Sequence, residues 1–88
     1  MWYRTGQVAK EIGVRPFVVL FWQKTFGIQE PRRTRHNDRL FTPAQVDTFR
    51  KIKALKPYMT LPGLQVLLEL APDLMEQFVE RIEEKSAG

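Results

Sequence analysis

Apolar residues recur at helical spacing from the start of the chain, and their first group predicts a short helix over residues 5–12. Val8 and Ile12 fall on one face of that segment. Thr5 belongs to a residue type that caps helix N-termini, and Gly13 can adopt the left-handed conformation that ends a helix.

A second predicted helix follows after a very short turn. Pro16 occupies the first helical position, which suits proline, and the helix extends to about Phe26 before Gly27 ends it. Two helices joined in this way favour a helix-turn-helix arrangement. The second helix of such a pair normally lies in the major groove of DNA.

Residues 31–41 lack a helical pattern and instead predict a β-hairpin. Two short extended runs flank His36, Asn37 and Asp38, and asparagine and aspartate tolerate turn geometry. Such a hairpin beside a helix-turn-helix would form a wing.

The clearest helix start follows the hairpin. Thr42 is a capping residue, Pro43 suits the first helical position, and Gln45 lies where it can close a capping box. The third helix then carries apolar positions that include Phe49, and Pro57 ends it.

Two further helices complete the prediction. Thr60 caps the fourth, Pro72 ends it, and its expected buried face comprises Leu61, Leu64, Leu67 and Leu68. Residues 73–76 resemble another capping box and start the fifth helix. Its apolar residues recur at spacings of three and four, and they would form either a packing face or a dimer interface: Leu74, Met75, Phe78, Val79 and Ile82. The predicted fold is therefore mostly α, with a small β-hairpin wing and four to five helices.

Composition narrows the class of protein. The chain has 88 residues, enough for one small domain, and no cysteine, which removes disulfides and thiolate metal sites. No secretory leader is visible, and the longest apolar run, residues 17–22, is far too short to span a bilayer. We expect a cytoplasmic, nucleoid-associated protein without a membrane partner.

Charge is divided unevenly between the two parts of the chain. Residues 1–56 hold twelve Lys or Arg against four acids, a net charge of +8. Residues 57–88 hold two against six, a net charge of −4. A basic surface suits a polyanion because each neutralised phosphate releases condensed counterions. An ordinary solvated surface would also explain the charge, so this observation alone leaves both interpretations open.

The order of motifs from Tyr3 to about Leu68 resembles the DNA-binding domain of the MerR-type transcriptional regulators. The matching residues are Tyr3-Arg4-Thr5-Gly6-Gln7-Val8-Ala9, Gly13-Val14, Pro16, Trp22, Phe26-Gly27, Pro31, Arg33-Thr34, Arg39-Leu40-Phe41 and Thr60-Leu61. The resemblance implies a winged domain over residues 1–70, with the helix at 16–26 in the major groove and the wing on the neighbouring backbone. It also implies dimers joined by a coiled coil, for which residues 71–88 offer one amphipathic helix.

The chain departs from the family pattern in two ways. The helix at 16–26 lacks the usual capping residue at its start and the usual polar residue and tyrosine before Trp22. If Val19, Trp22 and Phe26 face the core, the side chains that project outward are mainly apolar: Phe17, Leu20, Phe21 and Lys24. Such a face makes few hydrogen bonds to bases, although it can contact thymine methyl groups. The second departure is that no effector-binding domain or small-molecule effector site is evident.

The candidate DNA-binding residues lie on this helix and on the hairpin. They are Arg15, Phe17, Val18, Leu20, Phe21 and Lys24 on or beside the helix, and Arg32, Arg33, Arg35, His36 and Arg39 on the hairpin. Arginines on an extended wing can reach phosphate oxygens. The plainer interpretation is a solvated hairpin that charge keeps apart from other strand edges.

These features are consistent with two functions. The first is a regulator or architectural protein that binds double-stranded DNA through the wing and the helix at 16–26. The alternative is a protein-interaction module in which the apolar face of that helix docks a regulatory partner. No catalytic residues, metal ligands or cofactor are predicted, because the chain lacks cysteine, has a single histidine, and contains no phosphate-binding glycine loop.

Overall fold

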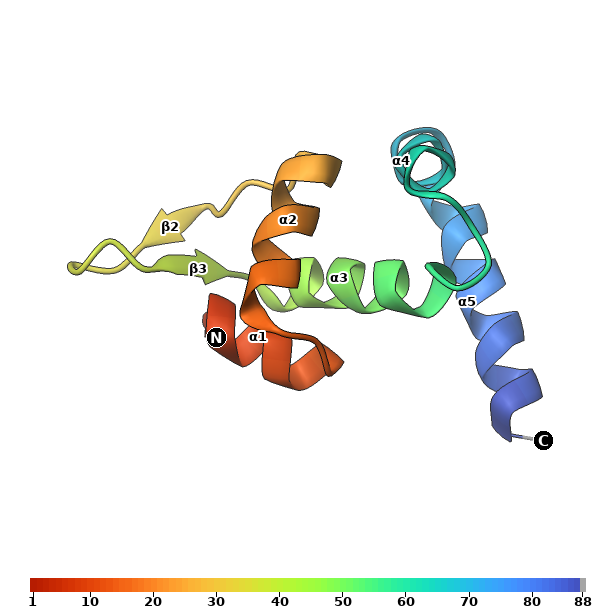
Figure 1. The fold of residues 1–88 in the computed structure, drawn as a ribbon, viewed down its shortest axis with the longest axis horizontal. Coiled ribbons are helices and arrows are strands. Elements are labelled where there is room, and N and C mark those ends of the chain that lie inside the picture. Colours follow the sequence, from red (N-terminus) through yellow and green to blue (C-terminus); the bar gives the residue numbers. More distant parts are fainter. Residues whose placement is uncertain (88) are drawn as a thin grey trace. The chain divides into compact units, whose positions relative to one another are not determined.

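The computed structural model describes residues 1–87, which form five helices and three short strands (Figure 1). Their order is β1 (Tyr3–Arg4), α1 (Thr5–Ile12), α2 (Pro16–Phe26), β2 (Arg32–Arg33), β3 (Arg39–Phe41), α3 (Pro43–Leu55), α4 (Leu61–Leu70) and α5 (Pro72–Ala87). Backbone contacts divide the chain into two units, Met1–Arg50 and the part from Lys51 onward, and the boundary lies inside α3.

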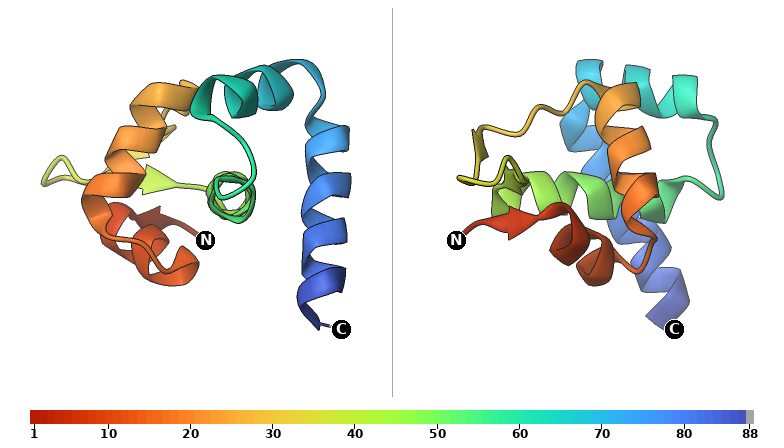
Figure 2. Two further views of the ribbon diagram at one scale, coloured as in Figure 1. Left: turned by 45° about the vertical axis from the view of Figure 1, so that its right-hand side comes forward. Right: turned by 60° about the vertical axis from the view of Figure 1, so that its left-hand side comes forward.

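The helix-turn-helix of the first unit confirms the predicted bounds of both helices. α1 and α2 pack against each other and are each ended by a glycine in the left-handed conformation, Gly13 at φ 74° and Gly27 at φ 64° (Figure 2). Only the predicted cap of α1 is wrong. Thr5 lies inside the helix, Arg4 precedes it, and the Gln7 side-chain oxygen accepts a hydrogen bond from the Arg4 backbone N–H at 2.8 Å.

The hairpin is confirmed, and a third strand that the sequence did not indicate joins it. β3 is the middle strand of an antiparallel sheet, with β1 on one side and β2 on the other. Tyr3 pairs with Phe41 across the first edge, and Arg32 pairs with Leu40 across the second. The wing is therefore anchored through its inner strand to the residues that lead into α1.

The core of the first unit lies where this sheet meets the helices. Phe41 is the last residue of β3 and is fully buried, and its ring lies edge-on to Phe49 of α3 with the centroids 5.6 Å apart. Val8, Val19 and Trp22 are also buried. Edge-to-face aromatic pairs of this kind favour one fixed orientation of the two rings.

The predicted capping box at the start of α3 is present in full. The Gln45 backbone N–H donates to the Thr42 hydroxyl at 3.2 Å, and the Gln45 side-chain oxygen accepts from the Thr42 backbone N–H at 3.0 Å. The Gln45 amide also donates to the Gln29 carbonyl at 2.7 Å. This last bond ties the start of α3 to the segment that connects α2 with the wing.

The second unit contains α4 and α5, which meet at a sharp corner at residues 70–72 (Figure 2). The prediction that Thr60 caps α4 is confirmed, because its hydroxyl accepts from the Gly63 backbone N–H at 3.2 Å. The predicted start of α5 is off by one residue. Pro72 is already helical, so Asp73 lies in the first turn and is not the cap.

The apolar residues of the second unit are only partly buried. On α4, Leu64 and Leu67 are buried, as predicted, whereas Leu61 and Leu68 are half-buried. On α5, Met75 and Val79 are buried and Ile82 is half-buried, while Leu74 and Phe78 are 42% and 41% exposed. The predicted stripe on α5 therefore comprises an inward and an outward face. Among the helices of residues 1–87, none has both the length and the apolar character that crossing a bilayer requires.

Candidate nucleic-acid interface

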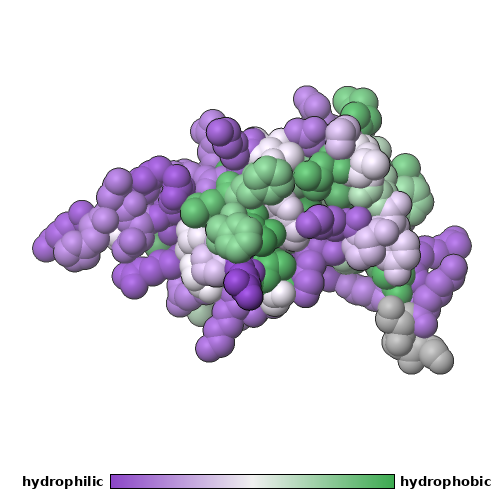
Figure 3. Space-filling view, viewed as in Figure 1, coloured by the Kyte–Doolittle hydropathy of each residue, from purple (hydrophilic) through white to green (hydrophobic). Residues whose placement is uncertain are grey.

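α2 presents an apolar face to solvent, as its helical spacing predicted. Phe17 is 64% exposed and Phe21 is 54% exposed, and Leu20 and Lys24 are exposed beside them. Val19 and Trp22 are buried on the opposite face, and Val18, one of the predicted contact residues, is half-buried. Figure 3 shows hydrophilic side chains along the wing and a hydrophobic area over α2.

The wing ends in a tight loop that projects two basic side chains. The Asn37 N–H donates to the Thr34 carbonyl and the Thr34 N–H donates to the Asp38 carbonyl, both at 2.9 Å. Asn37 takes the left-handed conformation at φ 69°. This is the pattern of a three-residue hairpin loop, a turn followed by a left-handed residue. Arg35 and His36 consequently lie at the exposed tip.

Strand alternation places the wing arginines on opposite faces of the sheet. Arg33 pairs with Arg39 and therefore shares a face with it, whereas Arg32 pairs with Leu40 on the other face. The Arg32 guanidinium lies 5.5 Å from the centre of the Trp2 ring, in cation–π geometry. Trp2 immediately precedes β1, so the N-terminal segment braces the outer face of the wing.

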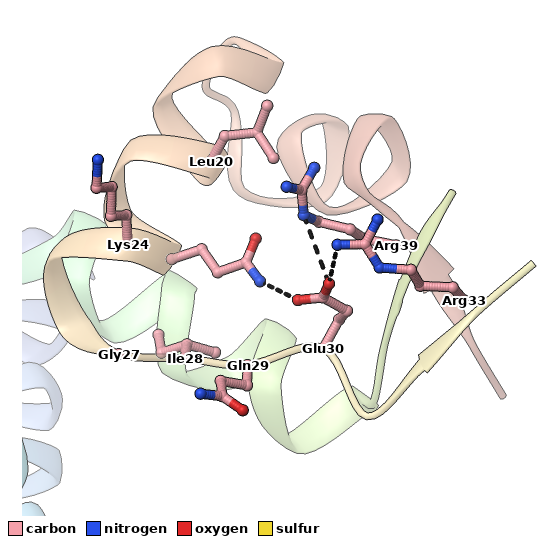
Figure 4. Close-up of a pocket in the computed structure, with 9 residues that line it drawn as sticks. Leu20, Lys24, Gly27, Ile28, Gln29, Glu30, Arg33 and Arg39 are labelled. Atoms are coloured by element: carbon pink, nitrogen blue, oxygen red, sulfur yellow. Dashed lines mark hydrogen bonds and ion pairs between the residues drawn. The ribbon is translucent and has the colours of Figure 1, made fainter. Parts of the chain in front are cut away.

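Glu30 lies between α2 and the wing (Figure 4). Its carboxylate binds Arg33 and Arg39, the two arginines on the inner face of the wing, opposite the face of Arg32. Its Oε1 atom is 2.6 Å from Nη2 of Arg33 and 3.7 Å from Nε of Arg39. Its Oε2 atom accepts a hydrogen bond from the side-chain amide of Gln23 on α2. The carboxylate thus connects the exposed helix to the wing.

Arg33 has a second anchor within the wing. Its Nη1 atom donates to the Asn37 side-chain oxygen at 3.2 Å and, more loosely, to the Asn37 carbonyl at 3.4 Å. The guanidinium of Arg33 is therefore held between Glu30 at the base of the wing and Asn37 at its turn. Even so, about 40% of the Arg33 side chain remains exposed to solvent.

The surroundings of Glu30 favour its charged form. Burial alone would raise the pKa of the Glu30 carboxyl, but hydrogen bonds from its own backbone N–H, from Gln23 and from Arg33, together with the positive charge of Arg33, outweigh that effect. The pKa of Glu30 consequently lies below its ordinary value of 4.5. The carboxylate is ionised throughout the neutral range.

The structure places the predicted residues in three groups. Arg15 precedes α2 and is exposed, and the exposed residues of α2 form the second group. The wing residues form the third, but Arg33 and Arg39 already have a carboxylate partner. Sequence reasoning missed Glu30, Gln23 and Trp2. One signal was present, because Glu30 is one of only four acids in residues 1–56 and stands beside the arginine-rich run.

These features define a winged helix-turn-helix domain. An exposed second helix, a basic hairpin beside it, and a third strand that joins the hairpin to the first helix occur together in the first unit. Within residues 1–87, no group of three His, Asp or Glu side chains is placed to hold a metal ion.

Comparison with known proteins assigns the family. Residues 3–69 match the family model described as the MerR HTH family regulatory protein. The chain therefore belongs to the MerR family of helix-turn-helix regulatory proteins, and the resemblance inferred from its motifs is confirmed. It is 37% identical over 51 residues, 58% of its length, to the HTH-type transcriptional regulator MlrA of Salmonella typhimurium and Escherichia coli. It is 31% identical over 86 residues, 98% of its length, to the HTH-type transcriptional repressor CarH of Myxococcus xanthus.

The matched regions are small parts of these relatives, 21% of MlrA and 27% of CarH. The relatives are transcriptional regulators, so the family to which the chain belongs is a regulatory and not an enzymatic one, as the sequence predicted.

Two solved structures share the fold. A MerR-family transcriptional regulator from Bacillus cereus has a TM-score of 0.71 at 13% identity, and the match covers 99% of this chain and 68% of that one. HiNmlR, described as a MerR-family regulator lacking the sensor domain and bound to promoter DNA, has a TM-score of 0.65 at 20% identity. That match covers 99% of this chain and 78% of the other. The fold is thus that of the family's DNA-binding domain.

The ion pairs of Glu30 lead to a prediction about stability. Replacing Glu30 with glutamine keeps the side-chain volume but removes the charge, so the free energy of unfolding at pH 7 should fall by about 1 kcal/mol. Because the pKa of Glu30 is lowered in the folded state, this difference should persist down to about pH 4.5 and vanish as the pH falls through the lowered pKa.

Urea denaturation of wild type and Glu30→Gln across this pH range measures the effect. Glu11→Gln is the matched control, since Glu11 is an exposed acid on α1. A stability difference between wild type and Glu30→Gln that is constant with pH would contradict the assignment.

Proposed function

We propose that this chain binds double-stranded DNA through its first unit, as the DNA-binding part of a transcriptional regulator or as a DNA-architectural protein. The observation that carries the proposal is the combination of an exposed recognition helix with a basic wing in one unit. Residues 31–41 contain four arginines and one acid. The four residues of α2 that project outward by helical spacing, Phe17, Leu20, Phe21 and Lys24, are all exposed. The related structure of HiNmlR is of a protein bound to promoter DNA, which supports the same role for this fold.

In this proposal α2 enters the major groove with a mainly apolar face. Phe17, Leu20 and Phe21 can contact thymine methyl groups but form no hydrogen bonds with base edges. Val18, which is half-buried, contributes at the margin of the same face. Direct readout of sequence is therefore weak, and most of the affinity comes from contacts with the DNA backbone.

Basic side chains at three places would supply these backbone contacts. Arg15 stands before α2, where the positive end of the helix dipole also favours phosphate. Lys24 lies on the exposed face of α2. The remainder belong to the wing: Arg32, Arg33, Arg35, His36 and Arg39. A protein with this activity would be associated with the nucleoid in the cytoplasm.

Salt dependence tests the backbone contacts. Affinity for a random-sequence duplex should fall steeply as salt rises, and Arg35→Ala should reduce the slope of log K against log salt by about one ion. Arg81→Ala, on α5 in the second unit, removes the same charge and should leave the slope unchanged. Fluorescence anisotropy at several salt concentrations measures both. Binding that does not respond to salt would contradict the proposal.

A second candidate function is a protein interface on the same helix. It is favoured by the exposure of Phe17 and Phe21, because adjacent exposed aromatic residues are typical of interaction surfaces. In this case a regulatory protein partner, and not DNA, would cover the apolar face of α2.

Phe21→Gln separates the two candidates. If α2 lies in the groove, affinity for DNA should fall roughly threefold to tenfold, with an unchanged salt slope because no cation is lost. Tyr58→Gln, at an exposed aromatic residue of the second unit, should leave the affinity unchanged. Equal DNA affinities of Phe21→Gln and wild type would instead favour the protein interface.

We further propose that residues 71–88 follow the winged domain of residues 1–70 as a dimerisation element, in which the outward face of α5 contacts a second copy of the chain. Support comes from the division of the α5 stripe. Met75, Val79 and Ile82 turn inward, whereas Leu74 and Phe78 remain exposed four residues apart.

Phe78→Glu tests this dimer. Burying the new charge against a partner helix is unfavourable, so the dissociation constant measured by analytical ultracentrifugation should rise at least about tenfold. Gln77→Glu adds the same charge one position away and should have a smaller effect. A wild-type chain that stays monomeric at high concentration would exclude the dimer.

A further inference from the structure

The carboxylate of Glu30 occupies a position suited to an anion. Arg33 and Arg39 approach the same oxygen atom, Oε1, from two strands of the wing. Two guanidinium groups that converge on one oxygen form the arrangement that proteins use to bind phosphate. A ligand phosphate entering this place would find the carboxylate already there.

This position is accessible from solvent. It opens into a cleft of about 540 Å³, lined on one side by Leu20 and Lys24 of α2 and on the other by Arg33 and Arg39 of the wing. Figure 4 shows Glu30 between these two sides. The cleft therefore joins the exposed face of the helix to the inner face of the wing.

We propose that Glu30 is an intramolecular competitor of DNA phosphate, which holds Arg33 and Arg39 in the free protein and must release them when DNA binds. This inference rests on the DNA-binding function proposed above and assigns to that surface a regulating contact. It implies that the affinity of the wing for DNA backbone is set below the value that its arginines alone would give.

Two contacts explain why Glu30 competes with phosphate and does not merely orient the arginines. Arg33 is also held by Asn37 at 3.2 Å, so its direction does not depend on Glu30 alone. Glu30 in turn retains a hydrogen bond from Gln23 through its other oxygen. Both sides of the ion pair thus keep a partner when they separate, which lowers the cost of exchanging the carboxylate for a phosphate.

The charge of the cluster gives the direction of the effect. Arg33, Arg39 and the ionised Glu30 together carry one positive charge, and glutamine at position 30 would raise this to two. Because backbone contacts read no sequence, the added charge should strengthen binding to any duplex. An orienting role for Glu30 predicts the reverse, since disordered arginines would bind more weakly.

The test compares the affinities of variants of the full 88-residue chain for a short random-sequence duplex. Fluorescence anisotropy at several salt concentrations measures these affinities. Glu30→Gln should bind roughly threefold to tenfold more tightly than wild type, with a salt slope steeper by about one ion. Glu11→Gln makes the same change in net charge on α1 and should gain less. In a background with Arg33→Gln and Arg39→Gln, the gain from Glu30→Gln should fall to that of Glu11→Gln.

Gln23→Met provides a second test in the opposite direction. It removes the alternative partner of Glu30, so the carboxylate should hold the arginines more firmly and the affinity for the duplex should fall. Equal or weaker DNA binding by Glu30→Gln, with a circular dichroism spectrum like that of wild type, would overturn the inference.

Failure of the proposed function can be distinguished from failure of this inference. If wild type and all variants leave the duplex unbound at low salt, the DNA-binding proposal is wrong. Titration with sulfate then tests whether Arg33 and Arg39 can bind an anion. Binding is followed through the Nε–H signals of these two arginines in NMR spectra. A saturable response in Glu30→Gln that is absent in wild type supports competition, and no response in either protein overturns it.

Discussion

The arrangement of the first unit depends on the antiparallel pairing of β3 with a neighbour on each side. Side chains of a strand alternate between two faces, so pairing fixes where every residue of this short strand points. Phe41 is directed into the core, Arg39 shares its face, and Leu40 lies on the other face. The burial of one phenylalanine therefore also sets the direction of the arginine two residues before it. A shift of one residue in register would exchange the two faces and remove the arginines from Glu30.

The net charge of the wing does not show which of its arginines are available to bind a ligand. Its four arginines are close in sequence, yet each has a different environment. Arg32 lies over Trp2, Arg33 bridges Glu30 and Asn37, Arg39 shares the carboxylate, and Arg35 is at the exposed tip. Side chains that already have a partner contribute to the electrostatic field but must exchange that partner to bind a phosphate. In the proposed complex with DNA, residues outside the wing would therefore modulate how strongly its arginines bind the phosphate backbone.

Local chemistry explains which parts of the fold could be predicted from the sequence. The bounds of α2 were correct because Pro16 and Gly27 suit its two ends whatever the rest of the chain does. The capping box of α3 was found for the same reason. In contrast, β1 has two residues and exists because β3 offers it an edge, so no local pattern marks it.

The candidate surface was predictable to a similar extent. Helical spacing identified the exposed face of α2, since that depends on periodicity within one element. The cluster around Glu30 was missed because its members come from α2, the connecting segment and both strands of the wing, and only the folded chain brings them together. The division of α5 into inward and outward faces was likewise missed, because burial depends on the neighbouring helix and not on hydrophobicity alone.

The placement of the two tryptophans gives the molecule an internal optical probe. Trp22 is buried in the core, whereas Trp2 is 41% exposed and stacked on a wing arginine. A water-soluble quencher such as iodide therefore reaches one indole and not the other, and separates the emission of the wing from that of the interior. Movement of the hairpin can consequently be followed in the unlabelled chain, independently of its unfolding.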